Sequence, residues 1–175
     1  MEFTKIYKDE VNQYFKEKGF DYIINSNDIN EIYTECLNED EINKLKIFIE
    51  YVLENDIKIN INKKNTTGNY PLLRACIKDN IEMVRLLIDY ANKNNIKLEL
   101  NEKNKKGNYP FLFACVRDNI EMVQLLINYA NLNEIILEMN EKDRYDASPL
   151  EWSCFNKNID MIQLLIEYAK KIKLY

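Results

Sequence analysis

Apolar residues recur through most of this chain at the spacing of an amphipathic helix. In the clearest stretch they stand at positions i, i+3, i+6, i+7 and i+10, as Ile81, Val84, Leu87, Ile88 and Ala91. Because that spacing puts them on one face of a helix, it predicts a helix over about Ile81–Asn92. A shorter helix is predicted over Pro71–Lys78, since proline suits the first helical turn, where its missing N–H costs nothing.

Two further elements complete this unit. Asp79 and Asn80 separate the helices, and both residue types cap helices and tolerate left-handed backbone. After the second helix, Ile96–Leu100 alternates apolar and polar residues, which predicts a short extended segment. The polar run Asn101–Asn108 contains Gly107 and predicts a turn that returns to the next proline. The pattern therefore predicts a helix, a tight turn, a second helix and an extended finger.

The unit repeats every 39 residues. The rarest residues carry this period: Pro71, Pro110 and Pro149, then Gly68 and Gly107, then Cys76, Cys115 and Cys154. Residues 68–103 and 107–142 are identical at 26 of 36 positions, and residues 146–170 repeat the pattern until it stops. A weaker copy fits residues 29–67. Periodic placement of rare residues indicates internal repetition.

The repeat divides the chain into five parts. We predict an N-terminal capping helix and lead-in at 1–28, a degenerate repeat at 29–67, full repeats at 68–106 and 107–145, and a C-terminal partial repeat at 146–175. The capping helix is predicted from an apolar stripe that Gly19 ends, made of Phe3, Ile6, Tyr7, Val11, Tyr14 and Phe15.

The unit resembles the ankyrin repeat. The family's signature, Gly-x-Thr-Pro-Leu-His-x-Ala-Ala, is similar to residues 68–76 and 107–115, and more weakly to 146–154. Its second-helix signature, Leu-Glu-Ile-Val-x-Leu-Leu-Leu, is similar to residues 81–88. The resemblance covers about residues 28–170 and implies an all-α, ankyrin-type helix-turn-helix solenoid with short β-hairpin-like fingers. A tetratricopeptide array is the competing solenoid, but it lacks a Gly-x-x-Pro turn followed by a finger.

The chain departs from the family pattern in three ways. Its unit has 39 residues against the usual 33, and the six extra residues lie between Ala91 and Asn101. The other departures are Tyr70 and Tyr109 in place of the threonine, and Leu73 and Leu112 in place of the histidine. Because that histidine normally ties down the turn with a hydrogen bond, we expect packing to hold the turn here.

Charge and cysteine content suggest where the protein works. The 175 residues include 24 Lys and Arg against 29 Asp and Glu, a net charge of −5, which disfavours a globally basic nucleic-acid binder. Charged residues make up 30% of the chain, and the N-terminal stretch lacks the apolar core of a signal peptide, so we expect no membrane association. Four cysteines without secretion predict a reducing, intracellular and cytoplasmic location.

The sequence offers little material for catalysis. Histidine is absent, which excludes mechanisms and zinc sites that need imidazole. The repeated cysteines Cys76, Cys115 and Cys154 are expected on the buried faces of the short helices, as apolar core residues. Glu82 and Glu121 fall in the first turns of helices, where they favour the helix dipole. We therefore predict no enzyme activity, no catalytic residue, no metal and no cofactor.

The resemblance implies a binding surface. In the ankyrin family the finger tips and the exposed side of the short helix form a concave binding face. Carried over by position, the partner-binding residues are Lys64, Thr66, Asn69, Ile77, Lys78, Lys103, Lys105, Lys106, Asn108, Val116, Arg117, Arg144, Tyr145 and Phe155. The lysine-rich tips predict a basic inner face opposite an acidic back. The hypothesis is a groove that selects an acidic protein segment, with Ile77, Val116 and Phe155 as apolar anchors; the alternative is simply solvated fingers.

Other functions stay open at this point. The last helix keeps the apolar pattern of an internal repeat, which favours a structural spacer or self-association through the C-terminal repeat. Nucleic-acid binding through the lysine-rich tips is a weaker hypothesis. The partner protein itself is not identified by the sequence.

Overall fold

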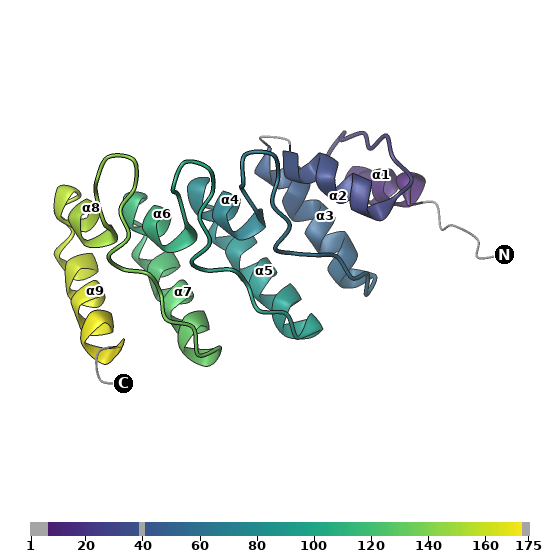
Figure 1. Cartoon of the computed structure of the whole chain (residues 1–175). Coiled ribbons are helices and arrows are strands. Elements are labelled where there is room, and N and C mark those ends of the chain that lie inside the picture. Colours follow the sequence, from purple (N-terminus) through teal and green to yellow (C-terminus); the bar gives the residue numbers. More distant parts are fainter. Residues whose placement is uncertain (1–6, 39–40, 173–175) are drawn as a thin grey trace.

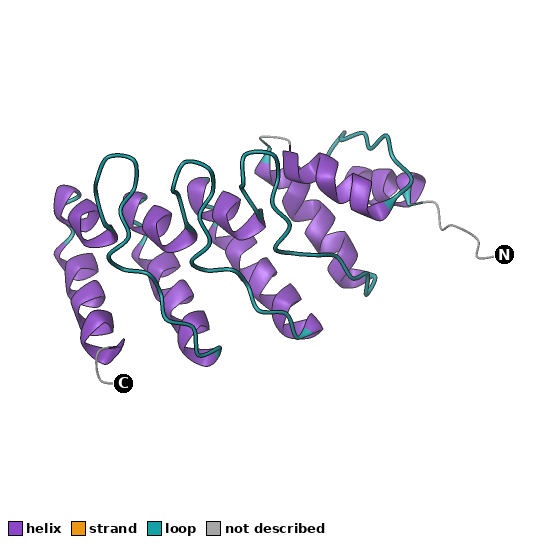
Figure 2. Cartoon of the chain, in the orientation of Figure 1, coloured by secondary structure: helices purple, strands orange, loops and turns teal. Residues whose placement is uncertain are grey.

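The computed structural model describes residues 7–38 and 41–172. Over these residues the chain forms nine α-helices and no β-strand, as Figures 1 and 2 show, which confirms the all-α fold. The helices are α1 (Lys8–Glu17), α2 (Ile29–Asn38), α3 (Ile42–Glu54), α4 (Pro71–Ile77), α5 (Ile81–Asn94), α6 (Pro110–Val116), α7 (Ile120–Leu132), α8 (Pro149–Phe155) and α9 (Ile159–Ile172).

The helices stack in two rows. The short helices α4, α6 and α8 pack side by side in one row, and the longer helices α3, α5, α7 and α9 do so in the other (Figure 1). Each short helix also packs against the long helix that follows it. Each of the three prolines stands at the start of its short helix, as the sequence predicts. The finger loops rise beside the row of short helices.

The tight turn inside each repeat has a local cause. Asp79 and Asp118 adopt left-handed backbone, with φ of 55° and 57°. The next residue then caps the long helix, because the side chains of Asn80 and Asn119 accept hydrogen bonds from the backbone N–H groups of Met83 and Met122. Two residues therefore reverse the chain, which keeps each helix pair compact.

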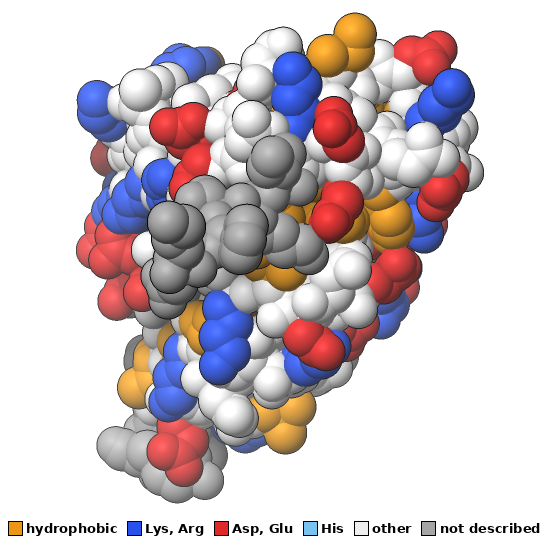
Figure 3. Space-filling view, turned by 90° about the vertical axis from the view of Figure 1, so that its right-hand side faces the viewer, with side chains coloured by type: hydrophobic (Ala, Val, Ile, Leu, Met, Phe, Trp, Pro, Cys, Tyr) orange, Lys and Arg blue, Asp and Glu red, His pale blue; other side chains and the backbone are white. Residues whose placement is uncertain are grey.

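The N-terminal helices extend the stack. α2 packs against α3, and α1 packs across α3 with Val11 and Phe15 fully buried. The predicted stripe residues Phe3 and Ile6 lie outside the described residues. Figure 3 shows this end of the molecule, where acidic and basic side chains are interspersed and hydrophobic side chains show only in separate spots.

The C-terminal end differs, because no further helix pair covers it within the described residues. Leu150 is 38% exposed, whereas its equivalents Leu72 and Phe111 are 1% and 0% exposed. Cys154 is exposed, so the prediction that it is buried like Cys76 was wrong. The pattern of the last repeat is that of an interior repeat, but burial requires a neighbour on both sides.

The extended segments keep their predicted alternation without forming strands. Leu98 and Leu100 are buried, and Lys97 and Glu99 that alternate with them are exposed. Side chains connect successive segments in place of a strand ladder. Asn62 donates from Nδ2 to the Lys97 carbonyl (2.8 Å) and accepts at Oδ1 from the Glu99 N–H (3.2 Å). Asn101 makes the same pair of bonds to the next segment. Because asparagine bridges occupy these positions, the hairpin-like fingers are loops in the structure.

The six extra residues of each repeat are held by tyrosine hydroxyl groups. The hydroxyl of Tyr90 accepts a hydrogen bond from the Ile59 N–H at 2.7 Å, that of Tyr129 from the Leu98 N–H at 3.0 Å. Tyr168 does the same for the last segment. Each tyrosine therefore fixes the extended segment of the preceding repeat against the long helix of its own.

Within the described residues, none of the helices has the length and hydropathy needed to cross a membrane.

Candidate functional site

Each finger turn is held by one side chain near its tip. Oδ1 of Asn65 accepts hydrogen bonds from the backbone N–H groups of Thr67 (3.0 Å) and Asn69 (2.9 Å). Asn104 and Asp143 make the equivalent bonds two and four residues on, at 2.8–3.1 Å. The sequence predicted that packing holds this turn, and the structure adds these hydrogen bonds from a side chain three residues before the motif that resembles the family signature.

Neighbouring fingers are also joined. Asn104 donates from Nδ2 to Oδ1 of Asn69 at 2.6 Å, and the Lys105 N–H donates to the Thr67 carbonyl at 3.2 Å. Gly68 has a φ of +80°, and a Cβ placed on it would lie 3.1 Å from the Asn104 Cα. Glycine therefore allows two adjacent fingers to approach closely.

The fingers and short helices border a groove of about 700 Å³, which we call the finger groove. Three successive fingers supply its polar wall, and α4, α6 and α8 supply its apolar floor. Nine of the fourteen predicted partner-binding residues line it: Thr66, Asn69, Ile77, Lys105, Lys106, Asn108, Val116, Arg144 and Tyr145.

Two predicted lysines lie outside the lining and join fingers to each other. Lys64 forms an ion pair with Glu102 of the next finger at 2.6 Å, and Lys103 pairs with Glu141. Pairs this exposed contribute at most about 1 kcal/mol each. Their larger effect is on the charge of the finger surface. Each glutamate balances a lysine that was predicted to belong to a basic inner face.

The remaining three predicted residues stand at the ends of the short helices. Lys78 is the exposed C-cap residue of α4. Arg117 donates from Nε (2.9 Å) and Nη2 (2.5 Å) to the Ile77 carbonyl, so it connects α6 to α4. Phe155 is 72% exposed, and its ring centroid lies 5.8 Å from that of Trp152. Phe155 therefore borders the finger groove without lining it.

Most of the aromatic floor consists of residues that were not among the predicted partner-binding residues. Phe113 and Trp152 line the finger groove one helical turn before the predicted positions at Val116 and Phe155. Residues three apart on a helix share a face. The positions three residues before Val116 and Phe155 could therefore have been predicted to line the groove as well. The finger anchors Asn104 and Asp143 also line the groove.

Trp152 is held in a defined orientation. Its Nε1–H donates to Oδ2 of Asp143 at 3.0 Å. The Tyr145 ring meets the indole edge-on, with centroids 6.3 Å apart and planes at 81°. The Arg144 guanidinium lies 4.6 Å from the Tyr145 ring centroid and donates to its hydroxyl group. Polar and aromatic contacts together fix this corner of the finger groove.

The finger groove carries a net positive charge. It is lined by Lys105, Lys106 and Arg144 against one carboxylate, Asp143. That carboxylate already accepts three N–H bonds, from Trp152 and two backbone groups. In the part of the chain that the structure describes, neither lysine has a carboxylate within ion-pair distance. The groove thus offers exposed cations over an apolar floor.

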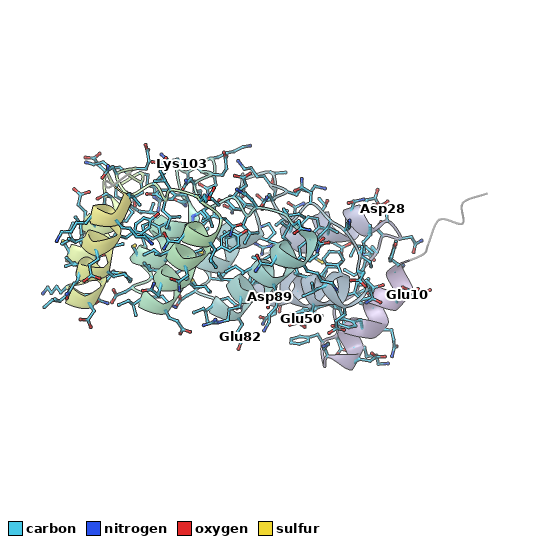
Figure 4. The ribbon with its side chains drawn as sticks, turned by 90° about the horizontal axis from the view of Figure 1, so that it is seen from below. Glu10, Asp28, Glu50, Glu82, Asp89 and Lys103 are labelled. Carbon is cyan, nitrogen blue, oxygen red and sulfur yellow. The ribbon has the colours of Figure 1, made fainter. Side chains whose placement is uncertain are left out.

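The long helices carry acidic side chains on the other side of the molecule. Figure 4 places Lys103 at one edge and Glu82 and Asp89 at the opposite edge. Lys46 donates to Glu82 at 2.5 Å, and this hydrogen bond lowers the pKa of the Glu82 carboxyl. Arg85 pairs with Glu121 at 2.6 Å. At the edge opposite the fingers, Glu82 and Glu121 therefore take part in ion pairs that join successive repeats.

The thiols are poorly placed for chemistry. All four cysteines are free, and Cys36, Cys76 and Cys115 are buried. Burial raises the pKa of the Cys115 thiol to about 12 and also raises that of Cys76, so both stay protonated near neutral pH. Among residues 7–38 and 41–172, no group of three Cys, Asp or Glu side chains is placed to hold a metal ion.

Comparisons with known proteins agree with this architecture. The family model described as Ankyrin repeats (3 copies) matches residues 95–175, and the one described as Ankyrin repeat matches residues 67–97. Together the two matches extend over α4 to α9 and favour the ankyrin resemblance over a tetratricopeptide array. A search of curated proteins gave no match.

Proposed function

Because the chain belongs to the ankyrin repeat family, whose members are generally protein-interaction modules, we propose that it binds another protein without catalysis through the finger groove. The ligand is an acidic segment of that partner. One observation supports the proposal most directly: a single groove built from three repeats contains both the exposed side chains of Lys105 and Lys106 and an apolar floor.

The groove suits a binding role because its shape is fixed before a partner arrives. Each turn is tied by an Asn or Asp side chain, and neighbouring fingers are joined by Asn104 and Lys105. A pre-ordered surface loses little conformational entropy on association. Lysines at the rim speed the encounter with an acidic segment, and apolar floor residues such as Val116 supply contact area.

Selection from a displayed random peptide library tests the proposal. We expect the full chain to enrich peptides in which Asp or Glu flank an apolar residue. The double variant Lys105→Glu, Lys106→Glu should bind the enriched peptides at least about tenfold more weakly, a difference of about 1.4 kcal/mol. Lys58→Glu, Lys170→Glu makes the same charge change at exposed positions outside the groove and serves as the matched control.

The outcomes separate the possibilities clearly. Enriched peptides without an acidic preference, or equal binding by both double variants, would contradict the proposed groove. Binding of DNA or RNA at low salt that the groove variant abolishes would favour the nucleic-acid hypothesis instead.

A second candidate function is self-association through the last repeat. It is favoured by the exposure of α8 and α9 residues whose equivalents in the preceding repeat are buried: Leu150 is 38% exposed against 0% for Phe111, and Ile166 is 41% exposed against 5% for Ile127. The occupant in this case is a second copy of the chain, and Ile166→Lys should reduce the association. Light scattering over a wide concentration range tests it, and a strictly monomeric wild-type chain would remove this candidate.

A further inference from the structure

The three fingers differ at one paired position. Nine residues after each finger anchor stands a residue of the next short helix, and the chemistry of the two residues differs along the stack. The pairs are Asn65 with Arg74, Asn104 with Phe113, and Asp143 with Trp152. Of these three pairs, the last joins a carboxylate to an indole, and there the two side chains are hydrogen-bonded to each other.

The difference between an amide and a carboxylate explains the bond between Asp143 and Trp152. In an asparagine anchor, Oδ1 accepts the two backbone N–H groups of the turn, and Nδ2 can only donate. Asn104, for example, donates from Nδ2 to Oδ1 of Asn69 at 2.6 Å. Aspartate has a second acceptor instead. Oδ1 of Asp143 holds the turn while Oδ2 accepts the N–H of Trp152 at 3.0 Å. An amide at this position would leave its NH₂ group opposite the indole N–H.

Two aromatic residues line the finger groove from neighbouring short helices. Phe113 and Trp152 occupy equivalent positions of α6 and α8, and both line the finger groove together with Val116. Packed helices lie about 8–10 Å apart. No ring contact between these two side chains occurs among the described residues, although Trp152 does contact Tyr145 and Phe155. An aromatic side chain that enters the finger groove at this place meets ring surface from both helices, and aromatic pairs prefer centroid separations of about 4.5–7 Å.

We propose that the acidic segment bound by the finger groove inserts one aromatic side chain between Phe113 and Trp152. Asp143 is the positioning residue that holds the indole ready. The carboxylates beside the inserted ring meet Lys105 and Lys106, neither of which has a carboxylate within ion-pair distance among the described residues. This inference rests on the proposed function and adds the identity of the anchor residue and the reason that the last repeat carries a carboxylate.

Fluorescence provides a direct assay, because Trp152 is the chain's single tryptophan. The probes are three synthetic peptides: acetyl-Glu-Glu-Phe-Glu-Glu-amide, the same peptide with Ala for Phe, and the same peptide with Gln for every Glu. Titration of the full chain should shift the Trp152 emission with the first peptide, and its affinity should exceed that of the other two by about tenfold or more.

The peptide series separates the two proposals. Equal affinity for the Phe and Ala peptides would overturn the aromatic anchor and leave the acidic groove standing. Equal affinity for the Glu-rich and Gln-rich peptides that both contain Phe would overturn the acidic preference. Absence of binding by all three at millimolar concentration would overturn both.

Variants test the positioning role of Asp143. Asp143→Asn should weaken the Phe peptide about tenfold and make the Trp152 fluorescence more accessible to acrylamide. Asp146→Asn removes the same charge from the same finger and should change neither. The double variant Asp143→Asn, Trp152→Phe recreates the Asn104 and Phe113 pair of the preceding repeat.

The double variant should recover affinity in an anisotropy titration with the labelled Phe peptide. Circular dichroism of each variant shows whether it folds. Wild-type affinity in folded Asp143→Asn, or no recovery in the folded double variant, would overturn the role assigned to Asp143.

Discussion

Removing the hydroxyl of Tyr129 tests how the long repeats are joined. This hydroxyl accepts a hydrogen bond from the Leu98 N–H at 3.0 Å and lies 3.5 Å from the Ile96 carbonyl. Tyr129→Phe keeps the ring packing but leaves the Leu98 N–H without its acceptor. Because Leu98 is only 2% exposed, water cannot readily replace the lost acceptor. An unsatisfied buried donor costs about 1–3 kcal/mol.

The expected effect is measurable by thermal and urea unfolding. For a chain of this size, each kcal/mol shifts Tm by about 2–4 °C, so a loss of about 2 kcal/mol lowers Tm by about 4–8 °C. The urea midpoint should fall with an unchanged m value. Tyr145→Phe is the matched control, because that residue is 64% exposed and its change should stay within about 0.5 kcal/mol. Equal Tm values for the two variants would refute the role of the tyrosine hydroxyl groups in joining repeats.

Three further predictions concern the core. Cys154 should react rapidly with a thiol reagent in the native protein while the other three cysteines react only after unfolding, and rapid modification of more than one thiol would contradict their burial. Arg74→Met should destabilise the protein by about 1.5–3 kcal/mol in urea unfolding, since the buried guanidinium donates to the last carbonyls of α2, including that of Leu37 at 2.7 Å. Stability should fall above about pH 9, because burial raises the folded-state pKa of the Cys115 thiol from 9.0 to about 12 and also raises that of the Tyr109 hydroxyl, so unfolding releases protons there. Constant urea midpoints from pH 9 to 11 would contradict this assignment.

The sequence determined the local elements and their order. Proline at the start of each short helix, the Asp-Asn turn and the apolar stripe of the long helix all act within a few residues of one another. The structure accordingly begins α4 at Pro71 and α5 at Ile81, as predicted, and the family matches confirm the ankyrin resemblance. The lining of the finger groove was also partly predictable, because the repeat fixes which positions recur at the finger tips.

Tertiary structure decided which of those positions act together. Lys64 and Lys105 look alike in the sequence, yet Lys64 pairs with Glu102 and Lys105 faces the finger groove. The burial of Cys154 likewise depends on whether a neighbouring helix pair covers it, and the side chain is exposed. Contacts that join the repeats link residues about one repeat apart, as between Tyr129 and Leu98. The pattern within one repeat specifies its helices. Which side chains of neighbouring repeats come into contact depends on how the packed repeats are positioned, and the sequence pattern of a single repeat does not determine that geometry.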